Sequence, residues 1–105
     1  MSISPGQAAN DLRANARFWA KRLRGKDAKI TEHMTRAATL IEAALAGQPP
    51  VRWHRDGAYL ARKLNEHSDR VAHWEFIFGA TQLSTSLWRG ARALEQLMVE
   101  ARDAV

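Results

Sequence analysis

Apolar residues recur along this chain at the three- and four-residue spacings of α-helices. No segment alternates apolar and polar residues as a half-buried strand would. Glycine, proline and capping residues interrupt the helical pattern at residues 25–27, 47–50 and 68–69. The pattern therefore predicts an all-α fold, a single-domain helical bundle of four to five helices over residues 1–105.

The first predicted helix covers residues 5–24. Ser4 is expected as its N-cap, with Pro5 at the first helical position and Gln7 three residues after the cap. Gly25 is the expected C-terminal glycine. Within about 60° of one another on this helix lie the apolar residues Leu12, Ala16, Trp19 and Leu23.

The second predicted helix covers about 28–46, with Asp27 as a cap and Gly47 at its end. Its apolar stripe consists of Ile30, Met34, Ala37, Ile41 and Ala44. The third predicted helix covers about 51–66, and Gly57 on its apolar face marks either a close approach or a break. That face consists of Trp53, Leu60 and Leu64.

The last helical region is predicted at 69–103, beginning at Ser68 or Asp69. Its helical pattern is carried by Ile77, Ala80, Ser84, Leu87, Ala91, Leu94 and Met98. Because 35 residues are long for a globular helix, the region is expected to be one long helix kinked near Gly79, with residues 81–86 as a second candidate kink.

The composition is that of an ordinary globular domain, with 46% hydrophobic and 26% charged residues among 105. The chain has no cysteine, which excludes disulfides, thiolate zinc sites and cysteine nucleophiles. The first ten residues lack the pattern of a secretory signal, and no apolar run is long enough to cross a bilayer. The expectation is a cytoplasmic protein without a membrane partner.

The positive charge is concentrated near the beginning of the chain. The formal net charge is +5. Residues 1–30 carry seven basic and two acidic side chains, whereas residues 31–105 carry nine of each. Such an asymmetry indicates a polyanionic or acidic partner for the first helix.

Four cations of the first helix, Arg13, Arg17, Lys21 and Arg24, fall in a sector about 80° wide, away from its apolar stripe. On a continuous helix they form a ridge about 17 Å long, suited to following a nucleic-acid backbone. A solvated surface helix is the alternative interpretation. The absence of acids between Asp11 and Asp27 favours the binding interpretation, because a face selected for solubility mixes both signs.

A second basic patch is predicted on the third helix. It consists of Arg52, Arg55, Tyr59 and Arg62. A tyrosine among arginines can stack on a base, and it can also cover the edge of the core. If the two basic faces lie side by side, they form a groove for the nucleic acid.

The aromatic residues of 71–78 surround their helix instead of forming one stripe, which indicates either a central core position or a covered interface. In the interface interpretation, the partner-binding residues are Trp74, Phe78 and Trp88, and the contact is with protein subunits of a larger complex or with a second copy of the chain.

The sequence calls for neither a metal nor a cofactor, and no enzymatic activity is expected. His67 and His73 are six residues apart, a poor spacing for metal ligands on a helix. Nucleophile motifs, phosphate-binding glycine loops and paired carboxylates are missing. The stretch "RKLNEH" resembles the Arg-x4-His core of the HEPN ribonucleases, but convergence of Arg62 and His67 would require a break in the helix between them.

A small, cysteine-free, basic, all-helical chain with exposed arginines resembles the small subunits of class 1 CRISPR effector complexes. The residues that carry the resemblance are Arg13, Arg17, Lys21, Arg24, Arg52, Arg55 and Arg62. It implies several copies in an antiviral ribonucleoprotein complex, RNA or DNA backbone contacts without base readout, and no enzymatic activity. The alternative is a phage-type protein–protein inhibitor or adaptor acting on a nucleoprotein machine, and a HEPN-like ribonuclease is third.

Overall fold

The computed structural model describes residues 3–74 and 80–103 and contains four α-helices and one 3-10 turn in this part of the chain. The elements are α1 (Pro5–Ala20), η1 (Gly25–Asp27), α2 (Ala28–Leu45), α3 (Trp53–Val71) and α4 (Ala80–Asp103). The all-α prediction is confirmed, since the described residues include no strand.

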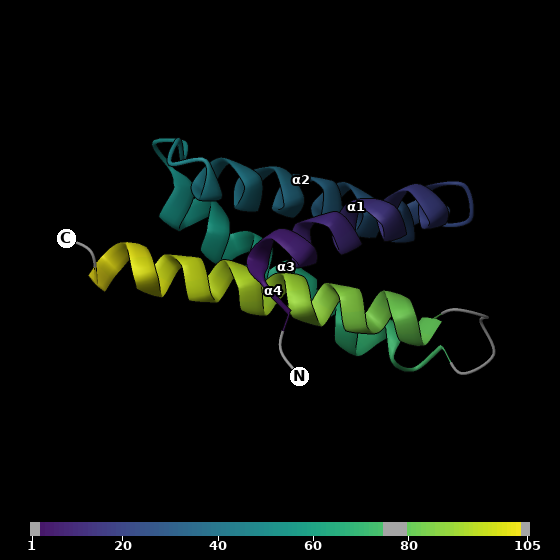
Figure 1. The fold of residues 1–105 in the computed structure, drawn as a ribbon. Coiled ribbons are helices and arrows are strands. Elements are labelled where there is room, and N and C mark those ends of the chain that lie inside the picture. The colour runs from purple at the N-terminus through teal and green to yellow at the C-terminus, as the bar shows by residue number, and fades with distance from the viewer. Residues whose placement is uncertain (1–2, 75–79, 104–105) are drawn as a thin grey trace.

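Two pairs of neighbouring helices build the bundle (Figure 1). α1 packs along α2, and α3 packs along α4. α1 also contacts α4, and α2 contacts both α3 and α4, whereas the described residues of α1 and α3 do not meet. The molecule is elongated, with extents of 46 × 29 × 19 Å. The sequence suggested that the basic residues of the first and third helices could form one groove. They do not line one groove directly, because α1 and α3 do not touch.

The predicted apolar stripes form the core. On α1 the stripe is buried from Leu12 to Trp19, and Leu23 continues it beyond the helix end. α2 buries Ile30, Met34 and Ile41 completely. Burying these aliphatic side chains supplies most of the favourable free energy of folding.

Two glycines allow α4 to approach its neighbours closely. A Cβ atom at Gly57 of α3 would lie 3.0 Å from Sδ of Met98, and one at Gly90 would lie 2.8 Å from Leu12 of α1. The sequence left open whether Gly57 marks a break or a close approach. Since α3 runs through this position without interruption, Gly57 marks a close approach.

α1 begins as predicted and ends early. The Gln7 N–H donates to Oγ of Ser4, and the Ser4 N–H donates to Oε1 of Gln7, which completes a capping box. The helix ends at Ala20 instead of Arg24. Residues 21–24 form the connection to η1, and Gly25 reverses the chain with a φ of 62°.

α2 matches its prediction, and Gly47 follows its end with a φ of 75°. Asp27 occupies the N-cap position, but its side chain makes no capping hydrogen bond. Its Oδ1 instead lies 2.7 Å from Nη2 of Arg70 on α3. The predicted capping role of Asp27 is therefore wrong, because an ion pair to α3 takes its carboxylate.

The last helix is long, as predicted, but the prediction that it begins at Ser68 or Asp69 is wrong. α3 continues to Val71, the chain turns at residues 72–74, and α4 runs from Ala80 through residues 81–86 without interruption. Ser68 lies inside α3, where its Oγ donates to the carbonyl oxygen of Ser84 at 3.0 Å. It joins α3 to α4 instead of starting a helix. Ile77 and the expected kink at Gly79 lie outside the described residues.

Candidate nucleic-acid interface

The four cations predicted as one ridge are divided between α1 and the connection that follows it. Arg13 and Arg17 lie on α1, and Lys21 is its C-cap residue. Arg24 lies beyond the helix in extended conformation, with φ of −134° and ψ of 161°. Because α1 ends four residues early, the continuous 17 Å ridge is a wrong prediction, although Arg17, Lys21 and Arg24 are all exposed.

Arg13 is held by a carboxylate of its own fold. Its Nε lies 3.1 Å from both carboxylate oxygens of Glu42, and its Nη2 donates to Oε1 of Glu42 and to Oγ1 of Thr39. The hydrogen bonds lower the pKa of Glu42 and raise that of Arg13. Arg13 is therefore engaged in joining α1 to α2, and it is not a free binding group.

The patch predicted on the third helix is brought together. Arg52, Arg55, Tyr59 and Arg62 line one surface hollow at the outer side of α3, together with Asp56 and Ala58. The three arginines are exposed, whereas Tyr59 is half-buried against the core. Successive turns of α3 place these side chains on the same face, as their three- and four-residue spacing predicts.

Cations from two helices surround the ring of Tyr59. The guanidinium carbon of Arg62 lies 5.7 Å from the ring centroid, and that of Arg36 on α2 lies 5.9 Å from it. Nζ of Lys63 lies at 5.7 Å. Neither Arg36 nor Lys63 was predicted from the sequence as a binding residue. The four-residue spacing from Tyr59 could have indicated Lys63, whereas Arg36 depends on how α2 packs against α3.

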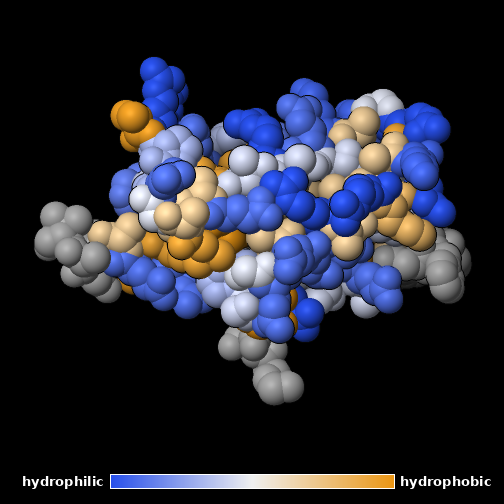
Figure 2. Space-filling view, turned by 45° about the horizontal axis from the view of Figure 1, so that its top comes forward, coloured by the Kyte–Doolittle hydropathy of each residue, from blue (hydrophilic) through white to orange (hydrophobic). Residues whose placement is uncertain are grey.

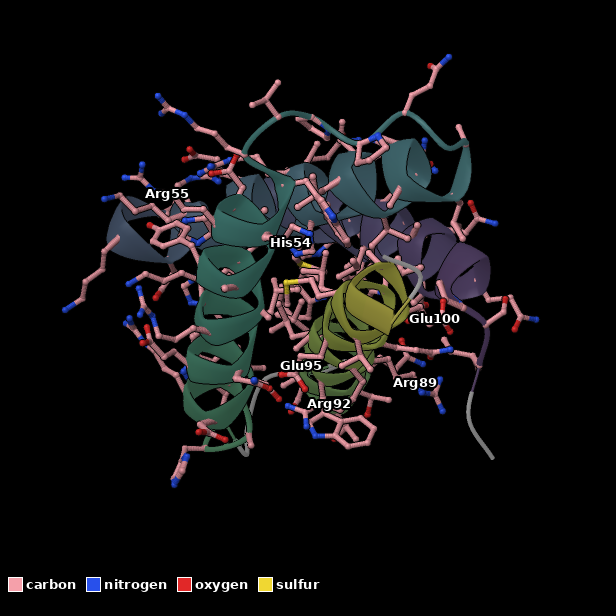
Figure 3. The ribbon with its side chains drawn as sticks, turned by 90° about the vertical axis from the view of Figure 1, so that its left-hand side faces the viewer. His54, Arg55, Arg89, Arg92, Glu95 and Glu100 are labelled. Carbon is pink, nitrogen blue, oxygen red and sulfur yellow. The ribbon has the colours of Figure 1, made fainter. Side chains whose placement is uncertain are left out.

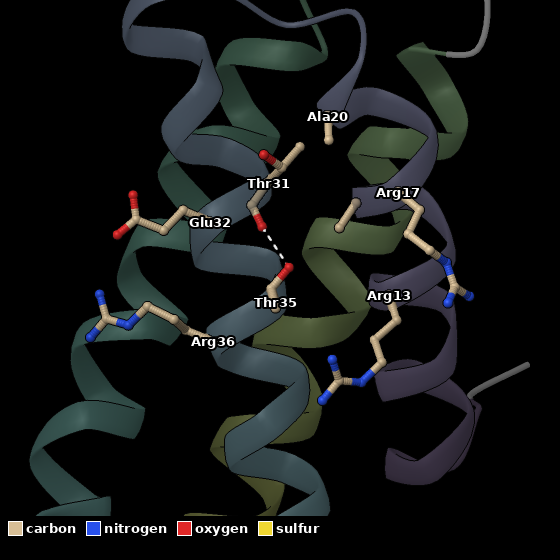
Figure 4. Close-up of a pocket in the computed structure, with 8 residues that line it drawn as sticks. Arg13, Arg17, Ala20, Thr31, Glu32, Thr35 and Arg36 are labelled. Carbon is tan, nitrogen blue, oxygen red and sulfur yellow. Dashed lines mark hydrogen bonds between the residues drawn. The ribbon is translucent and has the colours of Figure 1, made fainter.

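Two shallow grooves connect α1 to this patch across α2. The first is lined by basic, hydroxyl and acidic side chains, among them Arg13, Arg17, Thr31, Glu32, Thr35 and Arg36. In Figure 4, Arg13 and Arg17 extend from α1, Thr31 and Thr35 occupy the space between the helices, and Arg36 extends from α2 on the side away from α1. Thr35 and Arg36 also line the second groove, which reaches Asp56 of α3. The three helices thus share one continuous surface.

We call this surface the basic face. Its defining residues are Arg17, Arg36, Arg52, Arg55, Tyr59 and Arg62. None of these five arginines forms an ion pair with a carboxylate in the described part of the chain. The side of the molecule seen in Figure 2 is mostly hydrophilic, and hydrophobic surface is limited to smaller areas. The face therefore presents exposed positive charge that the fold itself does not neutralise.

The outer surface of α4 has a different charge arrangement. Arg92 lies 5.5 Å from the ring of Trp88, and its Nη2 donates to Oε1 of Glu95 at 3.0 Å and to Oδ1 of Asn65 at 3.2 Å. Figure 3 shows Arg89, Arg92, Glu95 and Glu100 together on α4, while Arg55 projects from α3 on the side away from α4. Arginines on α4 are thus interspersed with acids.

The three residues predicted to bind a protein partner differ in their exposure and in whether the structure describes them. Trp88 is 53% exposed, so its ring is accessible on α4. Trp74 is half-buried and packs against the hydrophobic core. Phe78 lies outside the described residues. The structure therefore places Trp74 at the edge of the core and leaves Trp88 as the exposed member of the group.

Two histidines that the sequence did not associate meet between α2 and α3. Nδ1 of His33 lies 2.8 Å from Nε2 of His67. Burial lowers the pKa of both side chains, and that of His67 falls to about 4. Their neutral forms can share one hydrogen bond, whereas two imidazolium rings would repel each other. Among the described residues, no group of three or more histidine or carboxylate side chains is placed to hold a metal ion.

The Arg62 and His67 pair lacks the convergence that a HEPN-type site would need. α3 is continuous from Trp53 to Val71, so the required break between the two residues is absent. Arg62 is on the exposed side near Tyr59, whereas His67 contacts His33. This arrangement gives no geometric support to the ribonuclease interpretation.

The fold and its charged surface define an all-α helical bundle with a basic face over α1, α2 and α3. Comparison with known proteins finds no matching protein-family model, curated protein or solved structure. None of the described helices is both long and apolar enough to cross a bilayer.

Proposed function

We propose that this protein is a non-catalytic subunit of a larger ribonucleoprotein complex and that it binds a nucleic-acid backbone through the basic face. One observation carries the proposal: five exposed arginines from three helices share a continuous surface without an internal carboxylate partner. A stable surface has no need for such an excess of one charge, because mixed signs give favourable pairs.

The mechanism is electrostatic. Each arginine that neutralises a phosphate releases condensed counterions, so the binding constant falls steeply with salt concentration. Arginines directed at phosphates carry no information on base identity, and sequence preference is therefore weak. The resemblance to class 1 CRISPR small subunits remains our proposal for the kind of complex, because such subunits also hold a backbone without reading bases.

An acidic protein surface is the competing partner for the same arginines, as in a phage-type inhibitor or adaptor. The basic face would then occupy an acidic surface of a nucleic-acid-binding protein. Its long-range attraction would also be weakened by salt. The two partners are distinguished by direct titration with a labelled oligonucleotide and by the effect of nuclease on co-purifying material.

The test is fluorescence anisotropy of a labelled 20-nucleotide strand, titrated with the protein at several salt concentrations. We expect binding at low salt, a linear decrease of log K with log salt concentration, and similar affinities for unrelated sequences. Arg55→Glu should weaken binding at least tenfold. Arg89→Glu is the matched control, since it makes the same charge change on α4, and it should change the affinity less than twofold.

Two results would contradict the proposal. The first is no binding of any oligonucleotide at low salt by a folded protein. The second is an equal loss of affinity in both variants, which would indicate a response to net charge and not to the basic face. Nuclease-resistant capture of an acidic protein, without oligonucleotide binding, would favour the inhibitor or adaptor instead.

A further inference from the structure

Tyr59 occupies a central position on the basic face. It lines the α3 hollow with Arg52, Arg55 and Arg62, so part of its ring is open to that hollow. The remainder packs against the core. The His33 ring meets the Tyr59 ring at 84° with centroids 5.9 Å apart, which fixes the orientation of the tyrosine from beneath.

The cations around Tyr59 stand back from its ring. Arg36, Arg62 and Lys63 lie 5.7–5.9 Å from the ring centroid. By contrast, the guanidinium carbon of Arg22 lies only 3.7 Å over the ring of Phe18 on α1, in direct stacking contact. Phe18 thus has its face covered by an arginine of the connection that follows α1, whereas none of the three cations is stacked directly on Tyr59.

We propose that Tyr59 is a stacking platform for an unpaired base, and hence that the basic face binds single-stranded nucleic acid in preference to a duplex. The inference rests on the proposed function, since the flanking arginines hold the phosphates on either side of the stacked base. Base–aromatic stacking tolerates any base and stabilises single-strand complexes. In a duplex the bases are already stacked on one another and cannot reach the ring.

Trp88 on α4 is another exposed aromatic residue with an arginine beside it. Its Arg92 is already hydrogen-bonded to Glu95 and Asn65. A strand stacked on Trp88 would therefore find the neighbouring Arg92 already engaged, and it would meet the carboxylate of Glu95. For this reason we assign the stacking platform to Tyr59 on the basic face and not to Trp88.

The experiment compares single-stranded and double-stranded oligonucleotides of equal length, as both DNA and RNA, by anisotropy at one salt concentration. The wild-type protein should bind single strands at least tenfold more tightly. Tyr59→Phe keeps the ring and should keep this preference. Tyr59→Leu should weaken single-strand binding roughly tenfold, the change that corresponds to about 1.4 kcal/mol, and leave duplex binding within twofold.

Phe18→Leu and Trp88→Leu are the matched controls, because each removes an exposed aromatic ring elsewhere, and both should retain the preference. Circular dichroism checks that Tyr59→Leu is folded. A second measurement needs no variant: a strand containing 5-bromouridine is photo-crosslinked to the wild-type protein, and the crosslink should map to Tyr59 by mass spectrometry.

Equal affinity for single strands and duplexes, or a crosslink that maps away from Tyr59, would overturn the stacking platform. In those cases the loss of binding in Arg55→Glu would still support the proposed backbone-binding function. Failure of the wild-type protein to bind any oligonucleotide would overturn both.

Discussion

The basic face and the outer surface of α4 contain similar groups with different partners. Each has an exposed or half-buried aromatic ring, Tyr59 or Trp88, with arginine beside it. On α4 the arginine is hydrogen-bonded to an acid three residues later in the same helix. On the basic face the neighbouring arginines come from two helices and have no described carboxylate partner. Exposure of arginine is therefore not sufficient for a binding surface, and the position of the nearest acid decides.

The rings of Tyr59 and Trp88 also differ in what supports them. Tyr59 is positioned by the neutral His33 and His67 pair in the contact between α2 and α3. Trp88 stands on a single helix and is more than half exposed. A ring fixed by two helices is preorganised for a ligand, since less conformational entropy is lost on binding.

The largest expected effect is the loss of oligonucleotide affinity when charges on the basic face are reversed. Arg36→Glu combined with Arg62→Glu should lower the oligonucleotide affinity on the order of 100-fold at low salt, because two phosphate contacts become repulsive. Arg92→Glu should lower it less than threefold. Both comparisons are made by anisotropy titration after circular dichroism has verified helicity. Comparable losses in the two proteins would remove the distinction between the surfaces.

The second prediction concerns how the stability of the fold depends on pH through the His33–His67 contact beneath Tyr59. The pKa of His67 falls from 6.5 to about 4 in the folded protein, chiefly through burial and secondly through His33. The folded state thus binds fewer protons than the unfolded state between these values. The free energy of unfolding is expected to be at its full value above pH 6.5, to decrease as the pH falls toward 4, and then to level off.

Because His67 is partly solvated, the expected loss is on the order of 1 kcal/mol, measured by urea unfolding at several pH values. His67→Gln should flatten this part of the profile. His54→Gln, which removes an exposed histidine, is the control and should retain the decrease. An unchanged pH profile in His67→Gln would show that the pair does not carry the dependence.

A third, smaller effect is expected from releasing Arg13, the cation of α1 that Glu42 neutralises within the fold. Glu42→Gln removes the carboxylate that holds Arg13 and should add a free cation beside the α1–α2 groove. The oligonucleotide affinity should increase about threefold, with a stability loss below about 1 kcal/mol because the pair is exposed. Anisotropy titration and thermal denaturation measure the two effects. Unchanged affinity would place Arg13 outside the binding surface.

The smallest effect is expected on α4. Glu95→Gln releases Arg92 from its acid neighbour, and it should change the stability by less than about 0.5 kcal/mol, as for other exposed pairs three residues apart. The oligonucleotide affinity should increase less than twofold, because one free arginine does not create a continuous face. An increase as large as that of Glu42→Gln would indicate that α4 also contributes to binding.

Helix periodicity predicted most of the fold correctly. The stripes from Leu12 to Trp19 and from Ile30 to Ile41 are buried as expected, because only these faces are apolar over several turns. The boundaries were less predictable. Ser68 is a good capping residue by type, yet it bonds to Ser84 across the α3–α4 contact. Local preference was overridden there by a tertiary hydrogen bond.

The candidate site was predictable where a single helix builds it. Arg52, Arg55, Tyr59 and Arg62 share a face through helical spacing alone, and the structure brings them to one hollow. The ridge on α1 was not predictable, because its last two members depend on where the helix ends. Nor was the neutralisation of Arg13, since Glu42 is 29 residues away in sequence.

The sequence by itself determined the all-α class, the buried stripes and the local excess of positive charge, because each depends on residue type and a fixed helical period. Tertiary packing alone decided which cations are neutralised, which reach Tyr59, and that α2 lies between the basic residues of α1 and α3. Ion pairs and surface grooves require side chains from different helices to meet. Their meeting is set by helix ends, crossing geometry and close approaches at Gly57 and Gly90.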